Sequence, residues 1–137
     1  MIAFDSISIG DELPVLQTKK ISRTTLALFA GASGDHNPIH IDIDFAKKCG
    51  MDDVFAQGML SMAYLGRLIT GWVPQQAIKD LSVRFTSITQ LYAEITCSGR
   101  VEEKYQKDGK NILTIFIEAK DQNGDIKIVG SAEIEIA

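Results

Sequence analysis

A carboxylic acid and an imidazole lie five residues apart in the segment 33–40, which reads SGDHNPIH. Asp35 and His40 are both residue types that give and take protons in general acid–base catalysis. Asn37 and Pro38 stand between them and favour a turn, which would hold the two side chains on a stiff loop. The spacing therefore predicts a proton-transfer site. The plainer alternative is a turn carboxylate beside a packed loop histidine.

Helical patterns flank this loop on both sides. Upstream, Ser22 and Thr24 are N-cap candidates for a helix that runs to about Ala32 with one apolar face. Downstream, Asp42 or Asp44 is positioned to cap a short helix that ends near residue 49. These two elements would fix both ends of the loop that carries the acid and the histidine.

The longest helical pattern runs from Gly58 to about Gly71, and Pro74 follows it. Apolar side chains cover most of its circumference, and Arg67 is its only charge. A helix of this kind is predicted to be buried on several sides. Its first N–H groups have no acceptor within the helix, so the N–H of Gly58 is available to a ligand oxygen.

Strand patterns fill the second half of the chain. Residues 81–89, 92–105, 111–120 and 126–136 are rich in β-branched side chains and alternate with period two. Asn123-Gly124 is a strong hairpin signal, so the last three strands are predicted to form an antiparallel meander. Residues 14–22 resemble an edge strand. The expected fold is α+β, with a curved antiparallel sheet wrapped around one long helix and a short helix–loop insertion.

Composition limits the functional classes. The 137 residues fit one domain, 1–137, and the net charge of −4 argues against nucleic-acid binding as the main function. No apolar run is long enough for a membrane helix and no signal peptide is visible, so no membrane partner and a cytoplasmic location are expected. With two distant cysteines and two histidines, no metal or cofactor site is expected. Asp35, His36 and His40 are the one alternative set of metal ligands that the sequence offers. Eight scattered lysines and arginines could form a local basic patch for a phosphate-bearing ligand: Lys19, Lys20, Arg23, Lys47, Lys48, Arg67, Lys79 and Arg84.

The motif and the layout together resemble the MaoC-like, or hydratase 2, branch of the hot-dog superfamily. The fixed positions of the family motif are occupied by Phe29, Ser33, Gly34, Asp35, Asn37, Pro38, Ile39, His40 and Ala46, and His36 stands at its variable position. A second family segment, at the start of the central helix, reads Ala56-Gln57-Gly58-Met59 here. Gln57 replaces the histidine that the family usually has at this position.

This resemblance implies reversible addition of water to a trans-2-enoyl thioester, which gives the (3R)-3-hydroxyacyl thioester. Asp35 and His40 would be the catalytic dyad, and the Gly58 N–H would hold the thioester oxygen. Asn37 would orient the loop, and Ser61 is a candidate pocket residue. The implied partners are an acyl-CoA or acyl-ACP substrate and a second subunit, in a homodimer or in a heterodimer with a related chain.

Two alternatives stay open from the sequence. A hot-dog thioesterase would hydrolyse the thioester, usually with an acid near or on the central helix, and residues 58–71 contain none. A non-catalytic partner subunit would lack the dyad, whereas this chain keeps both Asp35 and His40.

Overall fold

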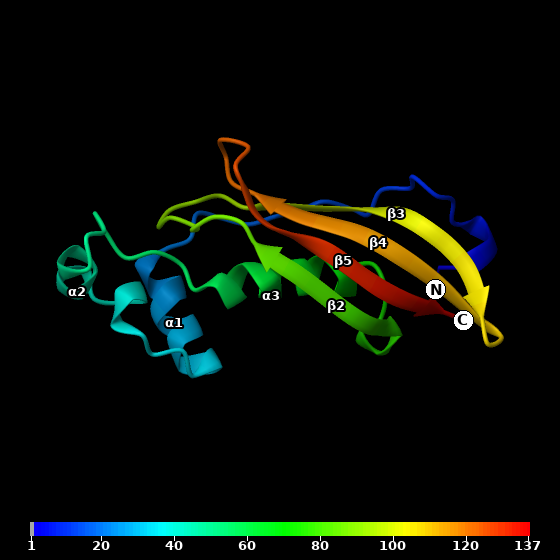
Figure 1. Ribbon diagram of the computed structural model, residues 1–137, viewed down its shortest axis with the longest axis horizontal. Coiled ribbons are helices and arrows are strands. Elements are labelled where there is room, and N and C mark those ends of the chain that lie inside the picture. The colour runs from blue at the N-terminus through cyan, green and yellow to red at the C-terminus, as the bar shows by residue number, and fades with distance from the viewer. Residues whose placement is uncertain (1) are drawn as a thin grey trace.

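The computed structural model describes residues 2–137 and contains one curled antiparallel sheet (Figure 1). Its strands are β1 (Leu16–Gln17), β2 (Ile78–Phe85), β3 (Thr96–Lys107), β4 (Lys110–Lys120) and β5 (Ile126–Ile136). They lie in the order β1-β3-β4-β5-β2, and every neighbouring pair is antiparallel. The predicted meander of the last three strands is therefore confirmed, and β2 forms a free edge of the sheet.

The sheet curls over the central helix. The helices are α1 (Arg23–Ser33), α2 (Ile43–Lys48) and α3 (Gly58–Thr70), with short 3-10 turns η1 (Phe4–Ser6), η2 (Pro38–His40) and η3 (Gln75–Ala77). In Figure 1, α3 runs beneath the sheet, while α1 and α2 lie together at the end of the molecule opposite the two termini. The expected α+β arrangement of one helix wrapped by a curved sheet, with a helix–loop insertion, is confirmed.

The core lies between α3 and the concave face of the sheet. Leu65 and Ile69 of α3 are fully buried, as are Ile115, Ile117 and Ile134 of the strands. The prediction that α3 is covered on several sides is only partly right, because Met59 is 53% exposed and Ala63 is also exposed. One face of α3 is therefore left uncovered by residues 2–137.

Several strand boundaries differ from the sequence prediction for local reasons. β3 begins at Thr96 rather than near residue 92, because Tyr92 adopts a left-handed conformation (φ 65°) that a strand cannot contain. β2 starts earlier than expected, at Ile78, and ends at Phe85. After Phe85, the hydroxyls of Thr86 and Ser87 both donate to the carbonyl of Ile126. These side-chain bonds accompany the end of the regular strand.

The expected edge strand at 14–22 is reduced to the two residues of β1. The N–H of Thr18 donates to the carbonyl of Ile95 and that of Ile21 to the carbonyl of Ala93. A regular antiparallel ladder advances two residues on both strands between such bonds, so the first strand carries one extra residue here. The segment Lys19–Lys20 is thus a bulge.

A buried ion pair closes the β4–β5 turn. The Asp121 carboxylate accepts from the N–H groups of Asn123 (2.9 Å) and Asp125 (3.0 Å), and its other oxygen lies 3.3 Å from the Lys127 ammonium. Burial disfavours the charged carboxylate, but these donors outweigh burial, so the pKa of Asp121 lies below its ordinary value. This contribution to stability is present above the unfolded-state pKa, near pH 4, and is lost as pH falls through the folded-state pKa.

We expect Asp121→Asn to lower the free energy of unfolding by about 1–3 kcal/mol at pH 7, because it leaves the buried Lys127 without its counter-charge. Urea unfolding of both proteins at pH 7 and at pH 3–4 measures this, and the difference should shrink at the lower pH. Asp125→Asn, an exposed change in the same turn, is the control and should cost little. Equal losses in the two variants, or a pH-independent gap, would contradict this account.

Candidate active site

Helix α1 and its two ends set the position of Asp35. The Ser22 side chain caps the N-terminus by accepting from the N–H of Thr25 (3.1 Å). Gly34 ends the helix at φ 75°, a left-handed conformation that favours glycine. The Ser33 hydroxyl donates to the carbonyl of Phe29 (2.7 Å) and accepts from the N–H of Asp35 (3.2 Å), so the acid directly follows a well-ordered helix end.

Asn37 organises the turn between the acid and the histidine. Its N–H donates to Oδ1 of Asp35 (3.3 Å), and its side-chain oxygen accepts from the N–H of Ile39 (3.1 Å), which caps η2. Pro38 occupies the first position of η2, where no N–H is needed. The amino-acid types of this loop thus serve its geometry, and the contacts of Asn37 are those of a positioning residue.

The imidazole of His40 is held in one orientation by the chain that precedes α3. Its Nδ1 lies 2.7 Å from the carbonyl oxygen of Phe55, and its ring meets the Phe55 ring edge-on at 5.0 Å between centroids. A carbonyl can only accept, so Nδ1 carries a proton. In the neutral ring, Nε2 then has a free lone pair and can act as a base.

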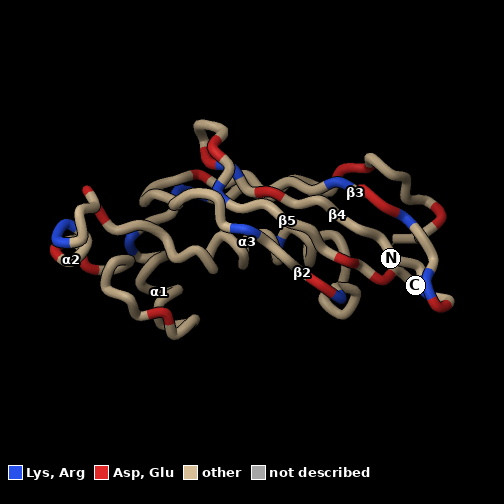
Figure 2. Tube along the Cα trace, in the orientation of Figure 1, with Lys and Arg blue, Asp and Glu red and all other residues tan. Residues whose placement is uncertain are grey.

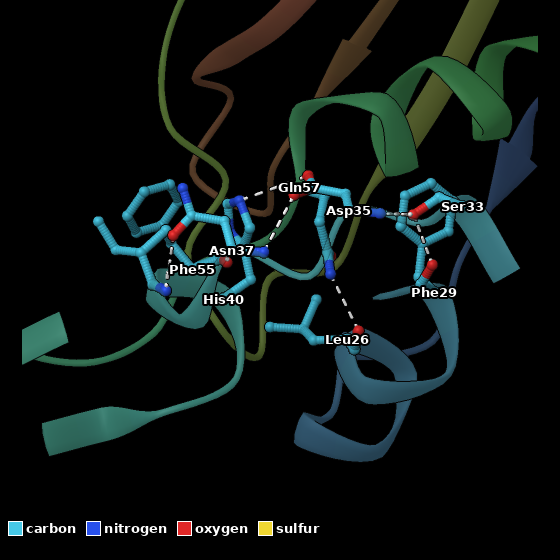
Figure 3. A network of polar contacts seen from close by, with 9 residues as sticks. Leu26, Phe29, Ser33, Asp35, Asn37, His40, Phe55 and Gln57 are labelled. Atoms are coloured by element: carbon cyan, nitrogen blue, oxygen red, sulfur yellow. Dashed lines mark hydrogen bonds and ion pairs between the residues drawn. The ribbon is translucent and has the colours of Figure 1, made fainter. Parts of the chain in front are cut away.

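Nε2 of His40 faces the carboxylate of Asp35 at 3.7 Å from Oδ2 (Figure 3). This distance is too long for a direct hydrogen bond, but one oxygen atom can lie within hydrogen-bond distance of both groups. The His40 side chain is 10% exposed and that of Asp35 is 43% exposed, so the open side of the pair is the acid side. His36, the other histidine of the loop, is exposed and has no part in this arrangement.

Gln57 joins the beginning of α3 to α1. It is fully buried, and its Nε2 donates to the carbonyl of Leu26 in α1 (2.9 Å). Its Oε1 has no hydrogen-bond partner among residues 2–137. This bond fixes the start of α3, where the Gly58 N–H has no acceptor within the helix.

Gly58 and Ser61 line a hollow of about 330 Å³ next to the free strand β2, together with Phe55, Phe85, Ile88 and Thr89 among other residues. We call it the Gly58 hollow. The Ser61 hydroxyl is buried and shares a hydrogen bond with that of Thr89 (3.3 Å), rather than bonding back to its own helix. A side chain at position 58 would approach the Phe85 ring, since a Cβ there would lie 3.1 Å from it.

The fold thus brings together Asp35, Asn37 and His40, while Gly58 and Ser61 lie in a separate hollow. Phe55 connects the two groups, because its carbonyl holds His40 and it lines the Gly58 hollow. The role of the Phe55 carbonyl was not predicted from the sequence, and no sequence signal could indicate it, since any residue supplies the same carbonyl. A larger hollow, of about 570 Å³, lies at the other end of α3 around Trp72 and Pro74, remote in sequence from the dyad.

Two general features complete the description. No group of three metal-binding side chains is found among the residues that the structure describes. Within the same residues, no helix is both long enough and apolar enough to cross a membrane.

Comparison with known proteins gives one consistent result. A family model described as MaoC like domain matches residues 6–120. A mitochondrial 3-hydroxyacyl-[acyl-carrier-protein] dehydratase of Arabidopsis thaliana is 29% identical over 114 residues, which cover 83% of this chain and 66% of that protein. An (R)-specific enoyl-CoA hydratase of Aeromonas caviae is 22% identical over 131 residues and covers 96% of each chain.

The structure has the same fold as the unliganded R-hydratase PhaJ1 from Pseudomonas aeruginosa. The TM-score is 0.83 at 28% identity, over 96% of this chain and 83% of that chain. The hot-dog fold expected from the sequence is confirmed by this likeness and by the curled sheet around α3. With most of its length matched by the family model, this chain belongs to the MaoC-like domain family.

Proposed function

We propose that this chain is a hydro-lyase that interconverts trans-2-enoyl and (3R)-3-hydroxyacyl thioesters. The observation that carries the proposal is the pairing of a His40 Nε2 lone pair with the Asp35 carboxylate at 3.7 Å, which suits one shared oxygen atom. The relatives named hydratase and dehydratase support the same reaction class. The shared oxygen is that of water in hydration and of the 3-hydroxyl group in dehydration.

In dehydration, His40 Nε2 removes the proton from C2 of the hydroxyacyl thioester. The electron pair of that C–H bond forms the C2–C3 double bond, and the C3–O bond breaks. Asp35 holds the departing hydroxyl and, in its protonated form, supplies the proton that makes it water. Hydration runs through the same steps in reverse, and both groups act on one face of the substrate.

The thioester oxygen becomes negatively charged as C2 loses its proton. The Gly58 N–H at the start of α3 is a suitable donor for this oxygen, and the helix dipole adds to its effect. Asn37 positions the dyad, and Ser61 shapes the Gly58 hollow. No step in this scheme uses a cofactor.

A thioesterase is less well supported. Residues 58–70 of α3 carry no acid that could activate water there. Burial also raises the pKa of the Cys97 thiol to about 12, so Cys97 is not a nucleophile near neutral pH.

We also propose that the chain works as a homodimer joined at β2. The second edge of β2 is free, and Met59, Phe85 and Ile88 are exposed close to it. Pairing of two β2 edges would cover these apolar side chains and close the Gly58 hollow. Light scattering at micromolar protein should give twice the mass of the chain, and a purely monomeric active enzyme would contradict this proposal.

The reaction is tested with crotonyl-CoA and then octenoyl-CoA, by following the ultraviolet absorbance of the enoyl thioester. The expected result is a loss of absorbance together with formation of the (3R)-hydroxyacyl product, which is identified by chromatography on a chiral column. Release of free thiol without hydration would instead indicate a thioesterase. No change with the CoA substrates, nor with the corresponding enoyl-ACP, would refute the proposed hydro-lyase.

A further inference from the structure

Three cationic side chains meet in one hollow between α1 and α3. This hollow, of about 360 Å³, is lined by Lys19, Lys20 and Arg67 with Thr25 and Tyr64, and we call it the Arg67 hollow. Arg67 is the only charged residue of α3, and the two lysines come from the segment that precedes α1. No acidic residue lines the hollow.

The cations of the Arg67 hollow form no close ion pair within the described part of the chain. Seven close ion pairs engage other residues, and among residues 2–137 no carboxylate lies within 4 Å of the charged nitrogens of Lys19, Lys20 or Arg67. The chain as a whole has a net charge of −4, and acidic and basic residues are interleaved along its strands (Figure 2). The Arg67 hollow is therefore locally positive on a chain whose net charge is negative. A concave site with three unpaired cations attracts anions.

The backbone brings both lysines to this place. Lys19 and Lys20 form the bulge between the Thr18–Ile95 and Ile21–Ala93 hydrogen bonds. In a regular strand, neighbouring side chains point to opposite faces, whereas a bulge redirects one of them. The extra residue allows two consecutive lysines to line the same hollow.

The hollow also contains hydroxyl groups. Thr25 lies in the first turn of α1, and Tyr64 is a largely buried residue, 9% exposed. Burial, opposed in part by the nearby Arg67 charge, raises the pKa of Tyr64, so its hydroxyl keeps its proton at neutral pH and can donate. Cations with neutral hydroxyl donors are the groups that bind phosphate oxygens.

The Arg67 hollow and the candidate active site are built on the same two helices, since α1 supplies Thr25 and leads into Asp35, and α3 carries Arg67 as well as Gly58. Leu26 of α1 bonds to Gln57 directly before α3, so Thr25 and Gly58 each lie next to this contact. Gly58 and Arg67 are nine residues apart on α3, or about 14 Å along the helix axis. The pantetheine arm separates the thioester from the phosphate of its carrier. If Gly58 binds the thioester oxygen, the phosphate is therefore expected at a site some distance from Gly58, as the Arg67 hollow is.

We propose that the Arg67 hollow binds a phosphate group of the thioester's carrier, with Lys19, Lys20 and Arg67 as the charged contacts. This inference rests on the proposed function, since it assigns the carrier end of the same substrate. It makes these three residues determinants of substrate binding, with no part in proton transfer.

The experiment compares Lys19→Met/Lys20→Met and Arg67→Met with a control that removes two charges elsewhere, Lys107→Met/Lys110→Met in the β3–β4 hairpin. Kinetics are measured with crotonyl-CoA and with crotonyl-pantetheine, which has no phosphate. We expect the two hollow variants to raise KM for crotonyl-CoA at least ~10-fold, equivalent to about 1.4 kcal/mol, with kcat little changed. KM for crotonyl-pantetheine should stay at the wild-type value, and the control should match wild type with both substrates.

Crotonyl-4′-phosphopantetheine distinguishes the source of the phosphate. A raised KM with this compound supports contact with the phosphate that CoA and acyl carrier protein share, and a raised KM with crotonyl-CoA alone supports contact with the nucleotide phosphates. An unchanged KM for crotonyl-CoA, or an equal rise with crotonyl-pantetheine, would overturn the proposal. Calorimetric titration with CoA itself separates the two failures, because weaker binding to the hollow variants would support this site even if the chain hydrated no enoyl thioester.

Discussion

Replacement of His40 by alanine, or of Asp35 by asparagine, should lower the turnover of enoyl-thioester hydration by at least ~10²-fold, the lower range for a positioned acid or base. His40→Ala removes Nε2, one of the two groups that face the shared oxygen across the 3.7 Å gap. Asp35→Asn keeps a hydrogen-bonding group of the same shape there, but its amide can neither supply nor take up the proton. The measurement is kcat with crotonyl-CoA at saturating substrate. Wild-type-like turnover in either variant would rule out the dyad.

A second histidine variant separates chemistry from folding. His40→Ala also removes the donor to the Phe55 carbonyl, which would leave a partly buried acceptor without that bond. His40→Asn offers an amide N–H close to the position of Nδ1 and has no counterpart of Nε2. We therefore expect His40→Asn to keep more of the stability lost in His40→Ala while turnover remains as low.

The loop itself supplies a matched control. His36 lies in the same motif, is exposed and contacts neither the Asp35 nor the His40 side chain among the described hydrogen bonds and ion pairs. His36→Ala should retain wild-type turnover. A loss equal to that of His40→Ala would mean that the loop, rather than the dyad, is sensitive to substitution.

Much of the site could be predicted because its geometry is local. Ser22 was one of two predicted N-cap candidates, and Asn37 and Pro38 were predicted to form the turn. These residues act on backbone groups within a few positions, and the structure has each of them in the expected place. Short-range preferences of this kind do not depend on the rest of the fold. The spacing of Asp35 and His40 in the sequence therefore indicates their proximity in the fold.

The contacts that orient the site could not be predicted in this way. The carbonyl that fixes the His40 tautomer belongs to Phe55, fifteen residues away, and a backbone carbonyl leaves no trace in the residue type. The exposed face of α3 could not be predicted for the same reason. Whether Met59 is buried depends on which distant elements pack against α3, and this is not visible in the helical pattern itself. The eight basic residues also looked equivalent, and only the fold brings Lys19, Lys20 and Arg67 into one hollow.

Gly130→Ala should be the most damaging small substitution in the sheet. Gly130 of β5 pairs with Val83 of β2, and a Cβ at position 130 would lie 1.9 Å from the Ser82 carbonyl oxygen and 2.7 Å from the Val83 Cα. These are backbone atoms, so no side-chain rotation relieves the clash and β2 must move away from β5. We expect the free energy of unfolding to fall by about 3 kcal/mol or more.

Gly31→Ala is the matched control for this substitution. Gly31 lies in α1, and nothing is found within 4 Å of a Cβ built there. In a helix interior, alanine is favoured over glycine by about 0.5–1 kcal/mol, so this variant should be slightly more stable than wild type. Urea unfolding of the three proteins measures both effects, and a Gly130→Ala variant as stable as wild type would contradict the close approach of β2 to β5.

The same substitution also tests whether β2 shapes the candidate site. Phe85, at the end of β2, lies against Gly58 and lines the Gly58 hollow. A shift of β2 would move the Phe85 ring, while the contacts that hold Asp35 and His40 come from α1, η2 and Phe55. In folded Gly130→Ala protein we therefore expect KM to rise more than kcat falls, and the opposite pattern would place the dyad, rather than the hollow, under the control of β2.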